Sequence, residues 1–208
     1  MARYLLLVQL LCLTVSVHAS GVLILGDSIS AAYGIEKSAG WVALMDQQLQ
    51  ERCPGYPVIN ASVSGETTAG GKSRLPALLS RHQPELVVIE LGGNDGLRGL
   101  SPMAMASNLE QMIMLSREAG ATAVLLGMRI PPNYGQQYTV LFEQQFRDVA
   151  QSTSVSWVPF FLDGVIEQGW VQGDGIHPTI DAQPLLLDTA LSVIEPQLPE
   201  RCEAKGGQ

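Results

Sequence analysis

The segment Val22-Leu23-Ile24-Leu25-Gly26-Asp27-Ser28-Ile29-Ser30 joins four apolar residues to a short polar turn. Four more apolar runs follow it, and successive runs begin about 30 residues apart, which is the length of a βαβ unit. Unbroken apolar runs, rather than alternating ones, are typical of strands buried on both faces of a parallel sheet. The pattern therefore predicts a five-stranded parallel sheet, with strands at residues 22–25, 58–61, 86–91, 123–128 and 155–160.

The segments between these runs have the apolar spacing of helices. Trp41, Met45 and Leu49, for example, fall on one helical face. Ser101 and Pro102 suit the N-cap and the first turn of a later helix. Helices are expected around residues 41–49, 75–79, 102–119, 138–149 and 181–195, the last ended by Pro196. Alternation of strands and helices predicts an α/β protein, a three-layer α/β/α sandwich.

The polar, glycine-rich clusters of the chain each come after a predicted strand. Because ligands of an open parallel sheet bind at the carboxyl ends of its strands, these clusters are expected to meet at one edge and form a site. They occupy residues 26–30, 64–71, 92–96 and 173–178.

One of the three histidines suits the role of a general base. His18 lies in the N-terminal segment, and His82 precedes the third strand, which places it at the opposite edge of the sheet. His177 lies in the last polar cluster, and Asp174 could fold back onto its Nδ1 atom. The alternatives are an exposed loop histidine and an ordinary Asp-Gly turn.

Ser28 follows Gly26-Asp27 directly after the first strand, where the turn exposes its side chain at the same edge. Together with His177 and Asp174 it is the candidate nucleophile of acyl transfer, and Asp27 is expected to order the turn. Gly-Asp-Ser alone is more often a plain turn. A metal site of Asp27, Asp174 and His177 is a further alternative, but it lacks a second histidine and a recognisable ligand spacing, so no metal is expected.

Gly65 and Asn94, with the Ser28 amide, suit the stabilisation of an oxyanion. A glycine amide can approach an oxyanion unobstructed, and an asparagine side chain donates a hydrogen bond without carrying charge. Asp95 is expected to support them. Because Asn-Asp-Gly is strong turn chemistry, a helix cap or an Asx turn is the alternative role of Asn94.

The composition limits the partners. The chain has 208 residues, most simply one domain, and a net charge of −8 from 12 Lys and Arg against 20 Asp and Glu. It contains no basic run, so a nucleic-acid partner is not expected.

The N-terminal residues have the pattern of a signal peptide. Arg3 precedes an apolar core at residues 4–13 that is too short to span a bilayer comfortably, and Val17-His18-Ala19 ends it with a small residue. Cleavage after Ala19 and export are expected, which leaves residues 20–208 as one domain without a stable membrane anchor. A retained transmembrane anchor is the alternative. In an exported chain Cys53 and Cys202 are able to form a disulfide, but their spacing does not show whether they meet.

The four clusters resemble the SGNH (GDSL-type) hydrolase superfamily. Residues 26–30 are similar to its first block, Gly65 to its second, residues 93–95 to its third and residues 174–178 to its fifth. Ile29 departs from the leucine that is common there. Residues 91–99 and 131–135 further resemble the bacterial periplasmic acyl-CoA thioesterase I, lysophospholipase and arylesterase branch.

The resemblance implies a monomeric, flavodoxin-like enzyme without a cofactor that hydrolyses thioesters, aryl esters and lysophospholipids. A carbohydrate deacetylase of the same fold and a non-catalytic periplasmic binding protein are the alternatives. Five residues after the fourth strand are candidates for an apolar groove that holds the acyl chain, although ordinary loop packing would equally explain them: Ile130, Pro131, Pro132, Tyr134 and Leu141.

Overall fold

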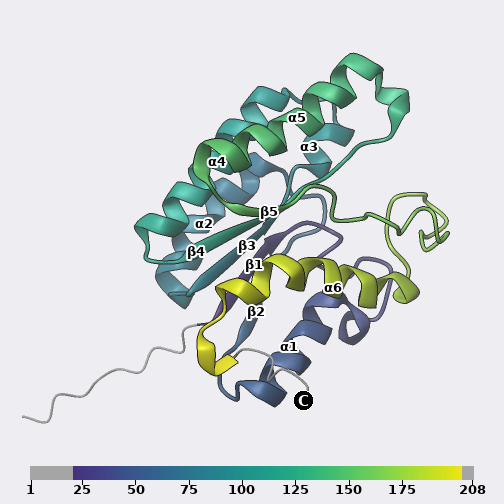
Figure 1. Cartoon of the computed structure of the whole chain (residues 1–208). Helices are drawn as coiled ribbons and strands as arrows, with labels where there is room; N and C mark the ends of the chain where they lie inside the picture. The colour runs from purple at the N-terminus through teal and green to yellow at the C-terminus, as the bar shows by residue number, and fades with distance from the viewer. Residues whose placement is uncertain (1–20, 203–208) are drawn as a thin grey trace, which may run out of the picture.

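The computed structural model describes residues 21–202 and contains one five-stranded sheet with helices on both faces (Figure 1). All neighbouring strands pair in parallel, in the order β2-β1-β3-β4-β5. The predicted fold class is therefore confirmed. The strands are β1 (Val22–Gly26), β2 (Val58–Asn60), β3 (Leu86–Glu90), β4 (Thr122–Leu126) and β5 (Ser156–Val158).

Burial differs between the centre and the edges of the sheet. Every residue of β1 and β3 is buried, as their apolar sequences predict, and the burial includes the acidic residue Glu90 that ends β3. The expectation of burial on both faces is wrong for the two edge strands, where Asn60 of β2 and Ser156 of β5 are exposed. An edge strand has a neighbour on one side only, so solvent reaches it, and the exposed residues of these two strands are polar.

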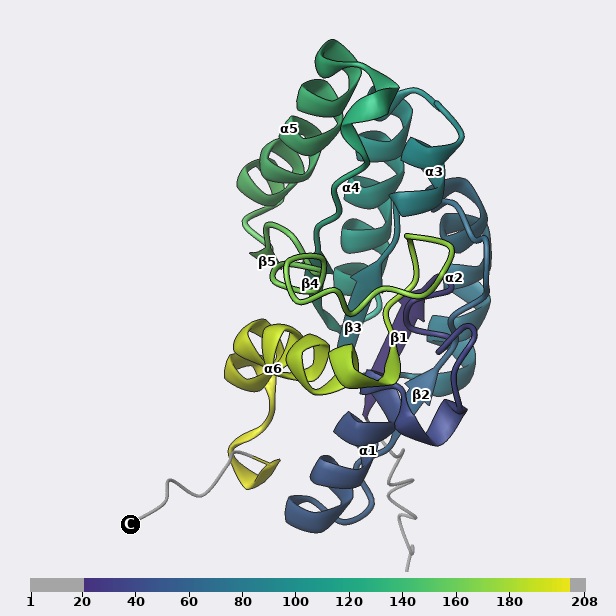
Figure 2. The same cartoon turned by 90° about the vertical axis from the view of Figure 1, so that its right-hand side faces the viewer.

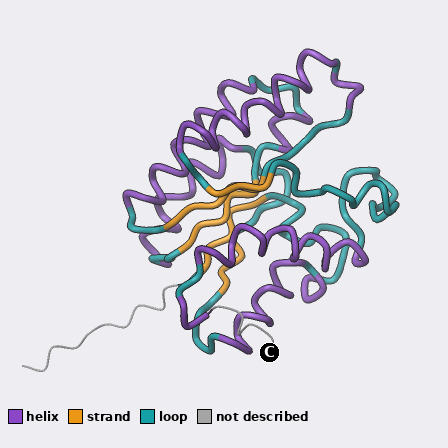
Figure 3. Tube along the Cα trace, in the orientation of Figure 1, coloured by secondary structure: helices purple, strands orange, loops and turns teal. Residues whose placement is uncertain are grey.

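Two helical layers enclose the sheet, as the ribbon and the tube both show (Figures 1 and 3). Helices α1 (Trp41–Arg52) and α6 (Gln183–Ile194) pack together on one face. The other face is covered by α2 (Thr68–His82), α4 (Pro102–Glu118) and α5 (Gln136–Thr153). The short helix α3 (Gly93–Leu97) was not predicted, because its polar, glycine-rich sequence has no apolar face.

Local signals fix several helix ends. The Ser101 side chain caps α4 by accepting a hydrogen bond from the Ala104 amide, and Pro102 occupies the first turn, as predicted. Thr67 caps α2 in the same way through the Gly70 amide. Pro196 ends α6, but the chain continues through it as a 3-10 turn at Glu195–Gln197.

Cys53 and Cys202 form a disulfide, with Cα atoms 4.9 Å apart. The bond joins the end of α1 to the last described residue, at the edge of the sheet where the strands begin. No helix within residues 21–202 is long and apolar enough to cross a membrane. The expected signal peptide, its cleavage after Ala19 and the alternative anchor lie outside the described residues.

Candidate active site

The loops that follow β1, β2 and β3 and the long connection after β5 converge at the carboxyl edge of the sheet. In the view turned by 90°, the chain between β5 and α6 runs back across the ends of the central strands (Figure 2). This path brings the last polar cluster beside the turn after β1. His82, in contrast, ends α2 at the opposite edge.

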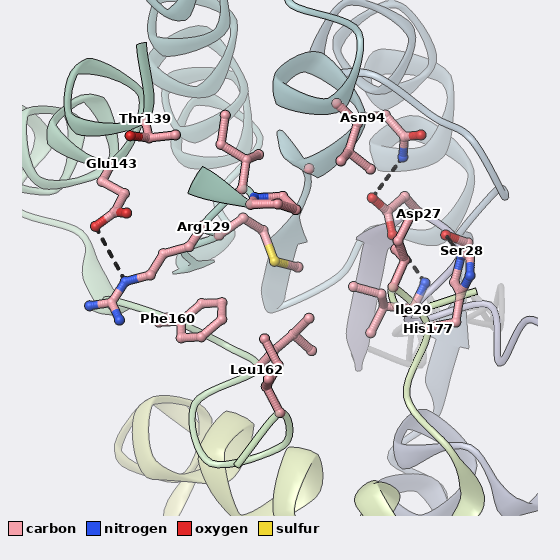
Figure 4. A pocket seen from close by; sticks show the side chains of 18 of the residues that line it. Asp27, Ser28, Ile29, Asn94, Arg129, Thr139, Glu143, Phe160, Leu162 and His177 are labelled. Carbon is pink, nitrogen blue, oxygen red and sulfur yellow. Dashed lines mark hydrogen bonds and ion pairs between the residues drawn. The ribbon is translucent and has the colours of Figure 1, made fainter. Parts of the chain in front are cut away.

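Ser28, His177 and Asp174 are joined in series by hydrogen bonds. The Ser28 Oγ atom lies 2.8 Å from His177 Nε2, although 149 residues separate them in the sequence. On the other side of the ring, His177 Nδ1 lies 2.7 Å from Asp174 Oδ2. Figure 4 shows Ser28 and His177 at one end of a cavity. With Nδ1 donating to the carboxylate, Nε2 is left to accept the serine proton.

The carboxylate is held by the turn that carries it. Asp174 Oδ1 accepts hydrogen bonds from the amides of Ile176, at 2.9 Å, and His177, at 3.0 Å. These bonds stabilise the ionised form. Donation from the His177 amide and ring, together with the Ile176 amide, holds the pKa of Asp174 well below its usual range. An ionised carboxylate is therefore present to orient His177 throughout the neutral pH range.

Two buried carboxyl groups order the turn that carries Ser28. Asp27 Oδ1 accepts from the Ile29 amide at 3.0 Å, and its Oδ2 accepts from the Asn94 side chain at 2.9 Å. Burial raises the pKa of Asp27 to about 6. Asp27 Oδ1 is thus bound within the turn and Oδ2 by Asn94 of α3, and within residues 21–202 no three His, Cys, Asp or Glu side chains are placed to hold a metal ion together.

Glu90, the last residue of β3, is the second buried carboxyl group, and the sequence analysis missed it. Its Oε2 atom accepts from the Ser30 hydroxyl at 2.6 Å and from the Ser30 and Asp27 amides, both at 3.3 Å. Burial, and then the negative charge of Asp27, raise the pKa of Glu90 well above its usual range. A signal was available, because an acidic residue ends an otherwise apolar strand.

Three hydrogen-bond donors at this edge are free to bind an anion. The amides of Ser28 and Gly65 donate to no acceptor within residues 21–202. Gly65 has a φ of +77°, a conformation that favours glycine. Asn94 gives one amide hydrogen to Asp27 and retains the other, and its side chain caps no helix. Asp95 accepts from the Thr68 hydroxyl at 2.6 Å and amide at 2.8 Å, which fixes the start of α2.

A cavity of about 670 Å³ opens beside Ser28 and His177. Ile130, Pro131 and Pro132 of the expected groove line it, whereas Tyr134 and Leu141 do not. The Tyr134 hydroxyl instead donates to the Leu97 carbonyl, and Leu141 is exposed. The remaining apolar lining was not predicted, because its residues come from helix α3 and from several loops that are distant in sequence: Ile29, Leu97, Met128, Phe160, Leu162, Ile166 and Ile176.

The far end of this cavity is polar. Arg129 forms an ion pair of 3.3 Å with Glu143, and its guanidinium lies 4.9 Å from the centre of the Phe160 ring. Figure 4 shows this pair at the end of the cavity opposite Ser28. The cavity thus presents reactive groups at one end, apolar walls along its length and a neutralised ion pair at the other end.

This fold and this arrangement of a hydroxyl, an imidazole and a carboxylate are those of a hydrolase built on an α/β/α sandwich. Comparison with known proteins identifies the family. The chain belongs to the GDSL-like lipase/acylhydrolase family, which matches residues 24–183. The resemblance expected from the four polar clusters is therefore confirmed.

Relatives with assigned names are esterases and thioesterases. Esterase TesA of Pseudomonas aeruginosa is 49% identical over 190 residues, covering 91% of this chain and 94% of its own length. Thioesterase 1/protease 1/lysophospholipase L1 of Escherichia coli K12 is 42% identical over 179 residues, covering 86% and 85%. The structure of the psychrotrophic esterase EstA from Pseudoalteromonas, inhibited by monoethylphosphonate, matches with a TM-score of 0.80 at 39% identity, covering 85% and 97%.

Proposed function

We propose that this protein is a serine hydrolase of carboxylic esters and thioesters, with Ser28 as nucleophile, His177 as general base and acid, and Asp174 as the group that orients His177. One observation carries the proposal: the continuous hydrogen-bonded series from Ser28 Oγ through both His177 nitrogens to Asp174. This series supplies a nucleophile, a proton acceptor and a fixed tautomer in one place.

The reaction follows from the geometry. Ser28 Oγ attacks the acyl carbon as its proton passes to His177 Nε2, and the carbonyl oxygen becomes an oxyanion. The Ser28 amide, the Gly65 amide and the Asn94 side chain stabilise this oxyanion, each by about 3 kcal/mol. His177 then gives its proton to the leaving alcohol or thiol. In the second half-reaction His177 activates water, which releases the acid and regenerates Ser28.

The cavity supports an apolar acyl group as the preferred substrate. Ile130, Pro131 and Pro132 lie along its wall, and the lining is predominantly apolar, so a longer acyl chain buries more surface than an acetyl group does. The names of the relatives support thioesters and lysophospholipids within the same class. A sugar deacetylase would instead need polar groups for the carbohydrate along this wall.

The protein is further proposed to act as an exported monomer without a metal or cofactor. The apolar core at residues 4–13, with cleavage after Ala19, supports export. The Cys53–Cys202 disulfide supports an oxidising compartment, because such bonds are rare in reducing cytosol. The proposed mechanism uses three side chains for bond making and two backbone amides with the Asn94 side chain for the oxyanion, and it calls for no further group.

Two substitutions test the proposal. Ser28→Ala should abolish hydrolysis of p-nitrophenyl esters, and His177→Ala should lower kcat by about 10⁴-fold or more, because each removes a group that takes part in bond making. Circular dichroism of the same samples checks that both variants are folded. Near-normal turnover by Ser28→Ala would end the proposal, and absence of turnover by the unsubstituted protein on every ester tested would favour a binding protein.

A chain-length series of p-nitrophenyl esters tests the substrate class. We expect kcat/KM to rise from acetyl to longer acyl groups, since each methylene that enters the cavity adds up to about 0.8 kcal/mol of apolar burial. A preference for acetyl esters would contradict the acyl-chain assignment and favour the deacetylase alternative, while leaving the serine mechanism in place.

A further inference from the structure

The side chain of Gln172 joins the loop that carries Ser28 to the turn that carries His177. Its Nε2 atom donates to the Tyr33 carbonyl at 2.8 Å and to the Pro178 carbonyl at 2.9 Å. The first of these bonds spans 139 residues of sequence. Both partners are carbonyl oxygens, which only accept, so the nitrogen of the carboxamide must face them and both of its hydrogens are used.

Each end of this connection continues directly to a reacting residue. On one side, the Tyr33 amide donates to the Ser28 carbonyl at 3.0 Å. On the other, the Gln172 amide donates to the His177 carbonyl at 2.7 Å. Together with the Ser28 Oγ–His177 Nε2 contact, these bonds form a closed ring: Ser28, Tyr33, Gln172, His177 and back to Ser28.

The surroundings of Gln172 show a close approach of the two segments. Gly34 has a φ of +76°, and a Cβ atom at this position would overlap the Gln172 carboxamide oxygen. The Tyr33 ring packs against the His177 ring with centroids 4.5 Å apart. In addition, Val171 and Pro178 pair as an antiparallel bridge. Gln172 therefore lies in one arm of a hairpin, opposite His177 in the other arm, and Asp174 lies at the tip.

We infer that Gln172 is a positioning residue, which sets the distance between Ser28 and His177 through its paired hydrogen bonds to Tyr33 and Pro178. This inference rests on the proposed roles of Ser28 and His177 and adds a residue that contacts neither reacting atom. Within residues 21–202, the other hydrogen bond that joins the hairpin to the Ser28 loop is the Ser28–His177 contact itself, and the Tyr33 ring adds packing against His177. Displacement of a base by about 1 Å can cost about a hundredfold in rate.

Three substitutions distinguish the effect of the two hydrogen-bond donors from the effect of the shape of the side chain. Gln172→Met retains the length of the side chain and removes both hydrogen-bond donors. Gln172→Glu retains the planar shape and presents oxygens to the two carbonyls. Gln172→Ala removes the side chain beyond Cβ. Gln168→Ala is the matched control, because Gln168 is an exposed glutamine in the same connection, outside the cavity lining.

The experiment measures kcat and KM for a p-nitrophenyl ester, the rate of inactivation by a p-nitrophenyl phosphonate, and the concentration of active sites by phosphonate titration. For the three Gln172 variants we expect kcat per titrated site to fall by about tenfold to a hundredfold with KM nearly unchanged. Inactivation should slow by the same factor, because phosphonylation uses the same Ser28–His177 pair. Gln168→Ala should match the unsubstituted protein.

A purely structural role gives a different result. Loss of stability would lower the concentration of active sites but leave kcat per titrated site unchanged. That result, or an increase in KM alone, overturns the inference while the proposed function stands. If the phosphonate does not modify Ser28 of the unsubstituted protein, the proposed function fails and the inference fails with it.

Discussion

At the scale of single residues, the environment of each carboxyl group determines its task. Asp174 is exposed and accepts three hydrogen bonds, so it stays ionised beside His177. Asp27 belongs to the same site but is buried, and its pKa is raised to about 6. Differences in exposure and hydrogen bonding thus move the pKa values of two aspartates near the same histidine in opposite directions.

Asp27 gives a pH dependence of stability. Its pKa is about 6 in the folded chain and about 3.9 when unfolded, so the folded state binds more protons between these values. The contribution of Asp27 to the unfolding free energy therefore falls as the pH rises from about 4 to about 6, and it stays at this lower value above that range. Asp27→Asn removes this group, so its stability relative to the unsubstituted protein should increase by up to about 3 kcal/mol between pH 4 and pH 7.

Urea denaturation at several pH values measures this difference. The changed contact with Asn94 is expected to shift the unfolding free energy of Asp27→Asn by the same amount at every pH, since an amide at position 27 does not titrate. The comparison therefore rests on the change with pH. A difference that stays flat, or that shrinks as the pH rises, would show that the pKa of Asp27 is not raised in the folded protein.

At the scale of elements, the ends of strands position the site. The last residue of β3, Glu90, accepts three hydrogen bonds from the turn after β1, and Asp95 in α3 fixes the first residue of α2. The contacts of Glu90 join the ends of the neighbouring strands β3 and β1, and those of Asp95 join α3 to the beginning of α2. The positions of Ser28 and Asn94 are consequences of these connections.

Glu90 offers a direct test of this arrangement. Glu90→Ala leaves two amides and the Ser30 hydroxyl without their buried acceptor, at a cost of about 1–3 kcal/mol for each group. Glu90→Gln keeps an acceptor oxygen and resembles the neutral acid that the raised pKa favours. We expect Glu90→Ala to lose about 3 kcal/mol or more of unfolding free energy and Glu90→Gln clearly less, with exposed Glu118→Ala as an unaffected control. Equal losses in both Glu90 variants would contradict the role assigned to the acceptor.

The elements also mark where sequence reasoning succeeds. Five apolar runs predicted the five strands, because the strands of a sheet covered by helices on both faces are rich in apolar residues. Helix α3 was missed because its polar, glycine-rich sequence has no apolar face. The role of Glu90 was missed because its partners, Asp27 and Ser30, lie 63 and 60 residues away in the sequence. The cavity lining shows this limit as well, since Phe160 and Leu162 reach it only through the path of the chain after β5.

At the scale of the whole molecule, the disulfide lies at one edge of the sheet and the proposed active site lies at the opposite edge. The Cys53–Cys202 disulfide joins residues 149 positions apart where the strands begin. Ser28 and His177, also 149 positions apart, meet where the strands end. The sequence was compatible with both contacts. It predicted only the contact of Ser28 with His177, because both residues follow strands of a parallel sheet and therefore lie at the same edge.

This separation predicts that stability and activity respond independently to loss of the disulfide. Replacement of Cys53 and Cys202 by alanine should lower the unfolding free energy by about 5 kcal/mol in the chain-entropy treatment, because the bond closes a long loop. The rate kcat per titrated site at 25 °C should be unchanged. Thermal denaturation and ester hydrolysis measure the two effects, with reduction of the unsubstituted protein as an independent check. An unaltered melting temperature, or a lower kcat at full folding, would contradict this account.

The central claim is that side chains from distant parts of the chain act on one acyl carbon. The most direct measurement is a crystal structure of the protein after reaction with an alkyl phosphonate. We expect phosphorus bonded to Ser28 Oγ, with the phosphonyl oxygen about 2.7–3.1 Å from the Ser28 amide, the Gly65 amide and Asn94 Nδ2, and the alkyl chain in the cavity. An adduct on another side chain, or a phosphonyl oxygen directed away from these donors, would contradict the account.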